Sequence, residues 1–213
     1  MWARLLRLAA ALACCVPAAG LAVTRRAAVG RAAAALAPLA PAALPCAARA
    51  VGNADAAAGD AIVAFVAADY GFSHPAAFES KPKPLRTHAD EVLLKRGSSQ
   101  IGVVVDPVKI STLADFGTLD FVGEKVVTSE RGRDGVTSAE LLSTASAEQN
   151  GLLYYDLDYA NECSRGDTRF LARCVVSKGK LYVFTAQAKV KDWGPDVSEA
   201  LTKARGSFRV NAS

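Results

Sequence analysis

Few residues of this chain could carry acid–base or metal chemistry. Asp156 and Asp158 alternate with apolar and aromatic residues over 152–160, so both carboxylates would lie on one face of a strand. Paired carboxylates can bind a cation or exchange protons. The pattern favours the alternative, a solvated face on a half-buried strand. His74 and His88 are the only histidines, and neither has metal-ligand spacing such as HxxxH. Ordinary strand-end or surface histidines are therefore the favoured interpretation, and His74 joins the two aspartates as a metal candidate.

The cysteines predict no disulfide. Five are present, and three of them lie in the first fifty residues: Cys14, Cys15 and Cys46. If residues 165–167 form a turn, Cys163 lies opposite about Thr168, and Cys174 is roughly 20 Å further along at ~3.3 Å per residue. A bridge requires Cα atoms within about 7 Å. The sequence also lacks G-x-S-x-G, P-loop, GxGxxG and zinc signatures, so we expect a protein that is not an enzyme.

Two small basic clusters could bind an acidic protein surface. Lys81, Lys83 and Arg86 lie on a proline-stiffened loop, and Arg131 and Arg133 lie beside glycines. Exposed basic loops can steer and orient a partner of opposite charge. The alternative is that both clusters are solvated loop charge.

The charge distribution excludes nucleic acid as the expected partner. The chain has 25 basic and 21 acidic residues, but residues 1–50 contain six of the basic residues and none of the acidic ones. The remainder therefore has 19 basic and 21 acidic residues. The apparent basicity belongs to the first fifty residues.

Those fifty residues predict a cleaved targeting leader. A positive start precedes an apolar run that ends near residue 23, and a second run of alanine, leucine and proline follows. Between them, Arg25-Arg26 before an alanine-rich run resembles a twin-arginine export signal. Small residues place the cut between about 47 and 57. Two addresses in tandem favour a complex plastid reached by the secretory route over a plain chloroplast transit peptide. We expect no transmembrane segment in the mature chain.

The rest of the chain predicts an arm or helix over 51–69 and one domain over 70–213. Helix spacing appears over 55–68, although its alanines also fit a flexible arm. Helices are also expected from Thr118 to 127 and from Pro195 to Gly206. Strands are expected at 70–74, 91–95, 100–105, 152–160, 168–177 and 180–188. Hairpin-connected strands beside helices indicate the α+β class, an antiparallel sheet flanked by helices.

Several of these segments together resemble the PsbP family. The most specific is KLYVFTAQA at 180–188, followed by Trp193. ISTLADFGTLDF at 110–121, VVVDP at 103–107 and SFRV at 207–210 are also similar, and their order is that of the family. The resemblance covers about residues 70–210.

The resemblance implies a non-catalytic protein of the thylakoid lumen, peripheral to the membrane, that binds lumenal subunits of photosystem II. In that role it would support the oxygen-evolving complex and help retain calcium and chloride. The family also contains assembly and repair factors, and a lumenal metal-binding protein is a third reading. No tightly bound cofactor is expected, only weak calcium or manganese. The family's basic N-terminal arm corresponds here to 51–69, which has no lysine or arginine.

Overall fold

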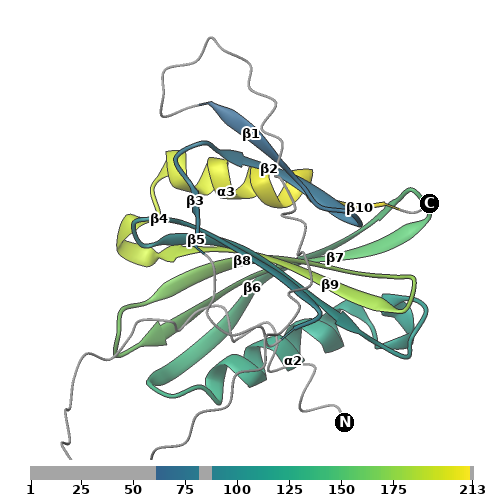
Figure 1. The fold of residues 1–213 in the computed structure, drawn as a ribbon. Helices are drawn as coiled ribbons and strands as arrows, with labels where there is room; N and C mark the ends of the chain where they lie inside the picture. Colours follow the sequence, from purple (N-terminus) through teal and green to yellow (C-terminus); the bar gives the residue numbers. More distant parts are fainter. Residues whose placement is uncertain (1–60, 82–87, 212–213) are drawn as a thin grey trace, which may run out of the picture.

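The structure is a computed structural model that describes residues 61–81 and 88–211. Two antiparallel sheets make up most of it (Figure 1). The larger sheet contains β3 (Glu79–Ser80), β4 (Asp90–Arg96), β5 (Ser99–Pro107), β6 (Val136–Gln149), β7 (Leu152–Cys163), β8 (Thr168–Ser177) and β9 (Lys180–Lys189). The smaller sheet contains β1 (Ile62–Val66), β2 (Tyr70–Pro75) and β10 (Arg209–Val210).

The strand order of the larger sheet is β3-β4-β5-β9-β8-β7-β6. Tight turns join several neighbours, and their residues accept the left-handed backbone that hairpins require. Gly97 has a φ of 57°, and Lys178 and Gly179 have φ values of 51° and 69°. In the smaller sheet, β2 lies between β1 and β10.

Two helices cover opposite faces of the larger sheet (Figure 1). Helix α2 (Leu119–Arg131) packs on β6 and β7, and a short 3-10 turn, η2 (Leu113–Asp115), lies beside it. Helix α3 (Pro195–Ser207) packs on β2, β8 and β9. The side chain of Thr118 accepts a hydrogen bond from the Phe121 backbone at the start of α2, as an N-cap residue does. The α+β class with an antiparallel sheet is confirmed.

A separate apolar core lies on each face of the larger sheet. On the α3 face, Phe72 meets Phe184 edge-on with ring centroids 5.4 Å apart, and Phe208 also contacts Phe184. On the α2 face, the rings of Tyr159 and Phe170 stack 4.7 Å apart. The predicted alternation along 152–160 is confirmed, because the side chains of β7 divide between these two cores.

The predicted helix over 55–68 is wrong where the structure describes it, since residues 62–66 form β1. Residues 55–60 lie outside the described part of the chain. Ile62, Phe65 and Val66 have helix-like spacing, but Val63 and Phe65 also alternate with less buried neighbours. Pairing with β2 decides between the two patterns, because it satisfies the backbone of one edge of β1 and packs Phe65 against Phe72.

Three further features differ from expectation. Strand β6 was not expected, and α3 continues through Ser207, so Gly206 lies in its last turn rather than after it. The register of β7 and β8 differs by two residues from the prediction, because Asn161, not Cys163, lies opposite Thr168. Cys174 pairs with Tyr155, which places it about 26 Å from Cys163 along the strand at ~3.3 Å per residue. Both thiols are free, and burial raises the pKa of Cys174 to about 12.

Candidate docking surface

Two aspartates of β7 form ion pairs with two arginines of β8. Asp156 accepts hydrogen bonds from Nε and Nη2 of Arg173 at 2.7 and 2.6 Å, and Arg173 also donates to the Gly206 carbonyl of α3 at 3.4 Å. Asp158 accepts from the same two nitrogens of Arg169 at 3.1 and 2.7 Å. These two-point pairs are the strong form of guanidinium–carboxylate contact.

The predicted solvated face is therefore wrong for these two aspartates. The side chains of Asp156 and Asp158 are only 12% and 13% exposed, and the arginine paired with Asp156 also contacts α3 at Gly206. Arg173 lies over the ring of Tyr154, and Arg169 lies over the ring of Trp193. Both oxygens of each carboxylate already accept guanidinium hydrogen bonds. The arrangement stabilises the contact between β7, β8 and α3 and leaves the carboxylates little capacity to bind a cation.

His74, the third metal candidate, lies in the smaller sheet, away from the strand that holds the two aspartates. Its side chain packs beside Phe72, and its Nδ1–H donates to the Pro75 carbonyl at 2.8 Å. Burial lowers the pKa of the His74 imidazole below its ordinary value of 6.5. Within residues 61–81 and 88–211, no group of three or more histidine, cysteine or acidic side chains is arranged to hold a metal.

The buried state of His74 predicts a pH-dependent stability. Because burial makes this imidazole harder to protonate in the folded chain, the unfolded chain binds a proton more readily as the pH falls through about 6.5. The free energy of unfolding should therefore fall between about pH 7.5 and about pH 5.5. His74→Phe should reduce this fall, which urea unfolding at the two pH values measures. An unchanged pH dependence in His74→Phe would show that other groups cause it.

His88 has a different environment from the one expected of a surface histidine. Its side chain is 6% exposed, and its Nδ1 lies 2.8 Å from a carboxylate oxygen of Asp106. The pair joins the segment before β4 to the end of β5. It therefore has a clear structural role at the edge of the larger sheet.

The structure describes three of the predicted basic docking residues: Lys81, Arg131 and Arg133. Lys83 and Arg86 lie outside the described residues, as do the predicted targeting residues Arg25 and Arg26. Lys81 pairs with Glu79 at 2.9 Å in the open solvent.

Arg131 and Arg133 are held by local contacts. Arg131 donates from Nε to the Ala139 carbonyl at 2.8 Å. Arg133 donates to both carboxylate oxygens of the buried Glu130 at 3.0 Å, and Asn161 donates to Glu130 at 2.6 Å. These arginines fix the end of α2 against β6 and β7. The charge of Arg133 is paired with Glu130, whereas Arg131 is held by a backbone carbonyl and stays exposed.

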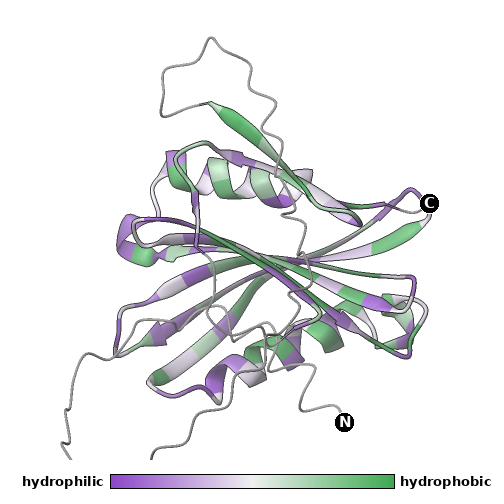
Figure 2. Cartoon of the chain, in the orientation of Figure 1, coloured by the Kyte–Doolittle hydropathy of each residue, from purple (hydrophilic) through white to green (hydrophobic). Residues whose placement is uncertain are grey.

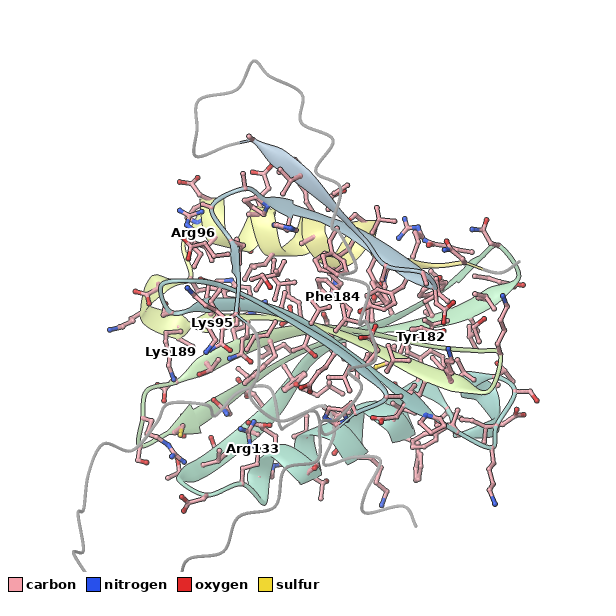
Figure 3. All side chains as sticks on the ribbon, viewed as in Figure 1. Lys95, Arg96, Arg133, Tyr182, Phe184 and Lys189 are labelled. Carbon is pink, nitrogen blue, oxygen red and sulfur yellow. The ribbon has the colours of Figure 1, made fainter. Side chains whose placement is uncertain are left out.

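Three other basic residues, at one end of the larger sheet, are better placed to meet a partner. Lys95 and Arg96 end β4, and Lys191 follows β9. Figure 3 shows Lys95, Arg96 and Lys189 gathered at this end of the sheet. Lys189 donates to Gly166 and Thr168, whereas the side chains of Lys95, Arg96 and Lys191 form no hydrogen bond or ion pair within residues 61–81 and 88–211. We call Lys95, Arg96 and Lys191 the basic end. Sequence reasoning missed it because these residues are far apart along the chain.

A cleft adjoins the basic end. It has a volume of about 490 Å³ and lies between the start of β1, the end of β2 and the first half of α3. Its apolar lining includes Ile62, Pro75 and Val197, and Arg96 lies at its margin. Glu199 and Lys203, one turn apart on α3, line the cleft and form an ion pair at 2.6 Å. A cleft of this kind can receive a side chain from a docked protein.

Comparison with known proteins identifies the family. Residues 66–210, most of the chain, match the sequence model of PsbP. The chain belongs to the PsbP family. The matched region runs from the last residue of β1 to the end of β10, so it includes the larger sheet, both helices, and strands β2 and β10 of the smaller sheet. None of the described helices is long and apolar enough to cross a membrane.

Individual relatives and a solved structure agree with this assignment. The chain is 33% identical over 103 residues to PsbP domain-containing protein 2, chloroplastic, of Arabidopsis thaliana, a match that covers 48% of this chain and 44% of the relative. It is 30% identical over 119 residues to PsbP domain-containing protein 7, chloroplastic, of the same plant, covering 54% and 42%. The chain thus spans less than half the length of these curated relatives. The solution structure of cyanobacterial PsbP from Synechocystis superposes with a TM-score of 0.61 at 19% identity, covering 75% of this chain and 96% of that one.

Proposed function

We propose that this chain is a non-catalytic, extrinsic protein of the chloroplast thylakoid lumen that binds lumenal subunits of photosystem II through its basic end. Membership of the PsbP family supports the general role, and the names of the two curated relatives support the chloroplast. The observation that supports the docking surface is the basic end itself, whose three cationic side chains form no hydrogen bond or ion pair with the described residues; Figure 3 labels two of them, Lys95 and Arg96. Such charges orient a partner and speed its association without requiring a large apolar interface.

The finer role that we propose is support of the oxygen-evolving complex and its calcium and chloride. In this role the protein contributes surface and electrostatic field and does not itself coordinate ions tightly. Asp156 and Asp158, the two carboxylates predicted as metal ligands, are already paired with arginines.

A second candidate function is assembly or repair of a photosystem. Two observations favour it: the matched relatives are named PsbP domain-containing proteins, and residues 51–60 have no basic side chain. Such a factor would bind transiently and in less than one copy per photosystem.

Salt washing of thylakoid membranes separates the two candidates. For the extrinsic subunit we expect nearly one copy per photosystem II, release by moderate salt, and a fall in oxygen evolution that calcium or chloride rescues. A small fraction of a copy, with oxygen evolution unaffected by its loss, would support the assembly factor. No association with photosystem II at low salt would exclude both.

Titration calorimetry with calcium, manganese and zinc tests the third reading, a lumenal metal-binding protein. Little or no heat at millimolar metal is the expected result. Binding that Asp156→Asn or His74→Phe abolishes would instead favour a metal site.

A further inference from the structure

The outer edge of β1 has backbone groups free to pair with another strand. The residues on either side of β1 form backbone hydrogen bonds on the β2 side: the Ala61 carbonyl accepts from the Ala76 N–H, and the Ala67 N–H donates to the Tyr70 carbonyl. Alternation then directs the backbone groups of Val63 and Phe65 toward β2, and those of Ile62, Ala64 and Val66 outward. Strand β1 lies at the edge of its sheet, and within the described residues no element pairs with its outer side.

The exposed side chains of β1 are apolar. Ile62 is 52% exposed and Val66 is 61% exposed, with the small Ala64 between them. The strand contains no charged residue, no proline and no register shift. Figure 2 shows its hydrophobic colour along the margin of the molecule. Natural edge strands usually carry one of these protective features, because an unprotected edge is a template for pairing.

The other sheet edges in the described part of the chain are protected. Strands β3 and β10 have only two residues each, and both contain a charged residue. Strand β6 is long, but Glu140 and Glu148 lie on it, and two register shifts interrupt its pairing with β7. These features follow the rules that prevent edge-to-edge association. Their absence from β1 alone sets this edge apart.

We propose that the edge of β1 pairs with β1 of a second copy of this chain, antiparallel and centred on Ala64. In this register Ile62 lies opposite the Val66 of the other copy, Ala64 lies opposite its counterpart, and Val66 lies opposite Ile62. Every one of these pairs consists of residues whose backbone groups point outward, so each can exchange both of its hydrogen bonds. The two smaller sheets become one continuous sheet.

The sequence of β1 favours a second copy over an unrelated strand. An apolar residue of similar size lies on each side of the small central alanine, so the edge is complementary to itself under a two-fold rotation. It offers no charge that would select a different sequence. Because each chain has one such edge, the association closes at two copies and does not propagate. A single strand pair buries little surface, so the dimer should be weak and dependent on concentration.

Disulfide trapping tests the register directly. In the proposed dimer the two Ala64 Cα atoms lie about 5.5 Å apart, within the range of roughly 4.4–6.8 Å that a disulfide accepts. The full chain would carry Ala64→Cys, with serine in place of Cys14, Cys15, Cys46 and Cys163. Mild oxidation should give a covalent dimer that is absent in the matched control Val190→Cys, whose site is 48% exposed but lies outside β1.

Sedimentation of the uncrosslinked full chain provides a second measurement. Val66→Lys should raise the dimer dissociation constant by about tenfold or more, since it places a charge on an apolar edge. Val190→Lys should leave that constant unchanged. Far-ultraviolet circular dichroism would confirm that both variants are folded.

Three results would overturn the proposal. One is equal crosslinking at positions 64 and 190. Another is a monomer at all concentrations with no Ala64→Cys dimer. The third is Ala64→Cys crosslinking to another lumenal protein but not to itself, which would assign the edge to a foreign strand. The proposed photosystem binding does not depend on any of these outcomes, and the salt-wash experiment can fail independently.

Discussion

Arg173→Met should lower the free energy of unfolding by about 3–5 kcal/mol, because it leaves a buried carboxylate without its partner. The side chains of Arg173 and Asp156 are 7% and 12% exposed, and two hydrogen bonds join them. Methionine retains much of the apolar contact of the arginine stem with the ring of Tyr154 but cannot compensate the charge. Urea unfolding followed by circular dichroism measures the change.

Arg169→Met is the matched control, because Arg169 forms the same type of pair with Asp158 but is 35% exposed. Although Asp158 is as buried as Asp156, the exposed position of Arg169 lets water reach Asp158 once the guanidinium is removed, which should limit the cost to about 1 kcal/mol. The double variant Arg173→Met with Asp156→Leu should recover most of the stability, since an apolar pair can replace a buried ion pair. Equal costs for Arg173→Met and Arg169→Met would contradict the assigned importance of burial.

The strands that were predicted correctly have strong local signals. Residues 155–159 alternate tyrosine and leucine with aspartate, and 181–184 form an apolar run of aromatic and aliphatic residues. In contrast, β6 contains alanine, serine and glutamate at positions that carry no clear period. It becomes a strand because β7 offers a free edge and α2 covers one of its faces. Such tertiary pairing outweighs weak local preference.

The candidate site shows a similar limit. The sequence placed Asp156 and Asp158 on one face correctly but did not supply their partners. Arg169 and Arg173 also share a face of their strand, so two charge pairs were available to antiparallel neighbours. The two-residue error in register would have placed Arg173 opposite Asp158 instead of Asp156. The basic end was harder to predict from the sequence, because Lys95 and Lys191 come to the same end of the sheet only when β4 and β9 pair with opposite edges of β5.

Reversal of the three charges of the basic end should weaken binding to photosystem II by on the order of a hundredfold at low salt. The variant is Lys95→Glu with Arg96→Glu and Lys191→Glu. An exposed charge facing an opposite charge contributes about 1 kcal/mol, so three reversals give about 3 kcal/mol. The measurement is binding of purified protein to salt-washed photosystem II membranes as the salt concentration rises. Wild-type affinity should fall with salt, whereas the weak binding of the variant should change little.

A matched variant separates the position of the charge from its amount. Lys109, Lys125 and Lys178 are exposed and lie away from the basic end, and their reversal to glutamate changes the net charge equally. If net charge alone controls the approach to the membrane, both triple variants should lose affinity to the same extent. If the basic end is the docking surface, the matched variant should bind within about threefold of wild type. Equal losses would exclude the basic end as the docking surface, because long-range attraction without a preferred face depends on total charge.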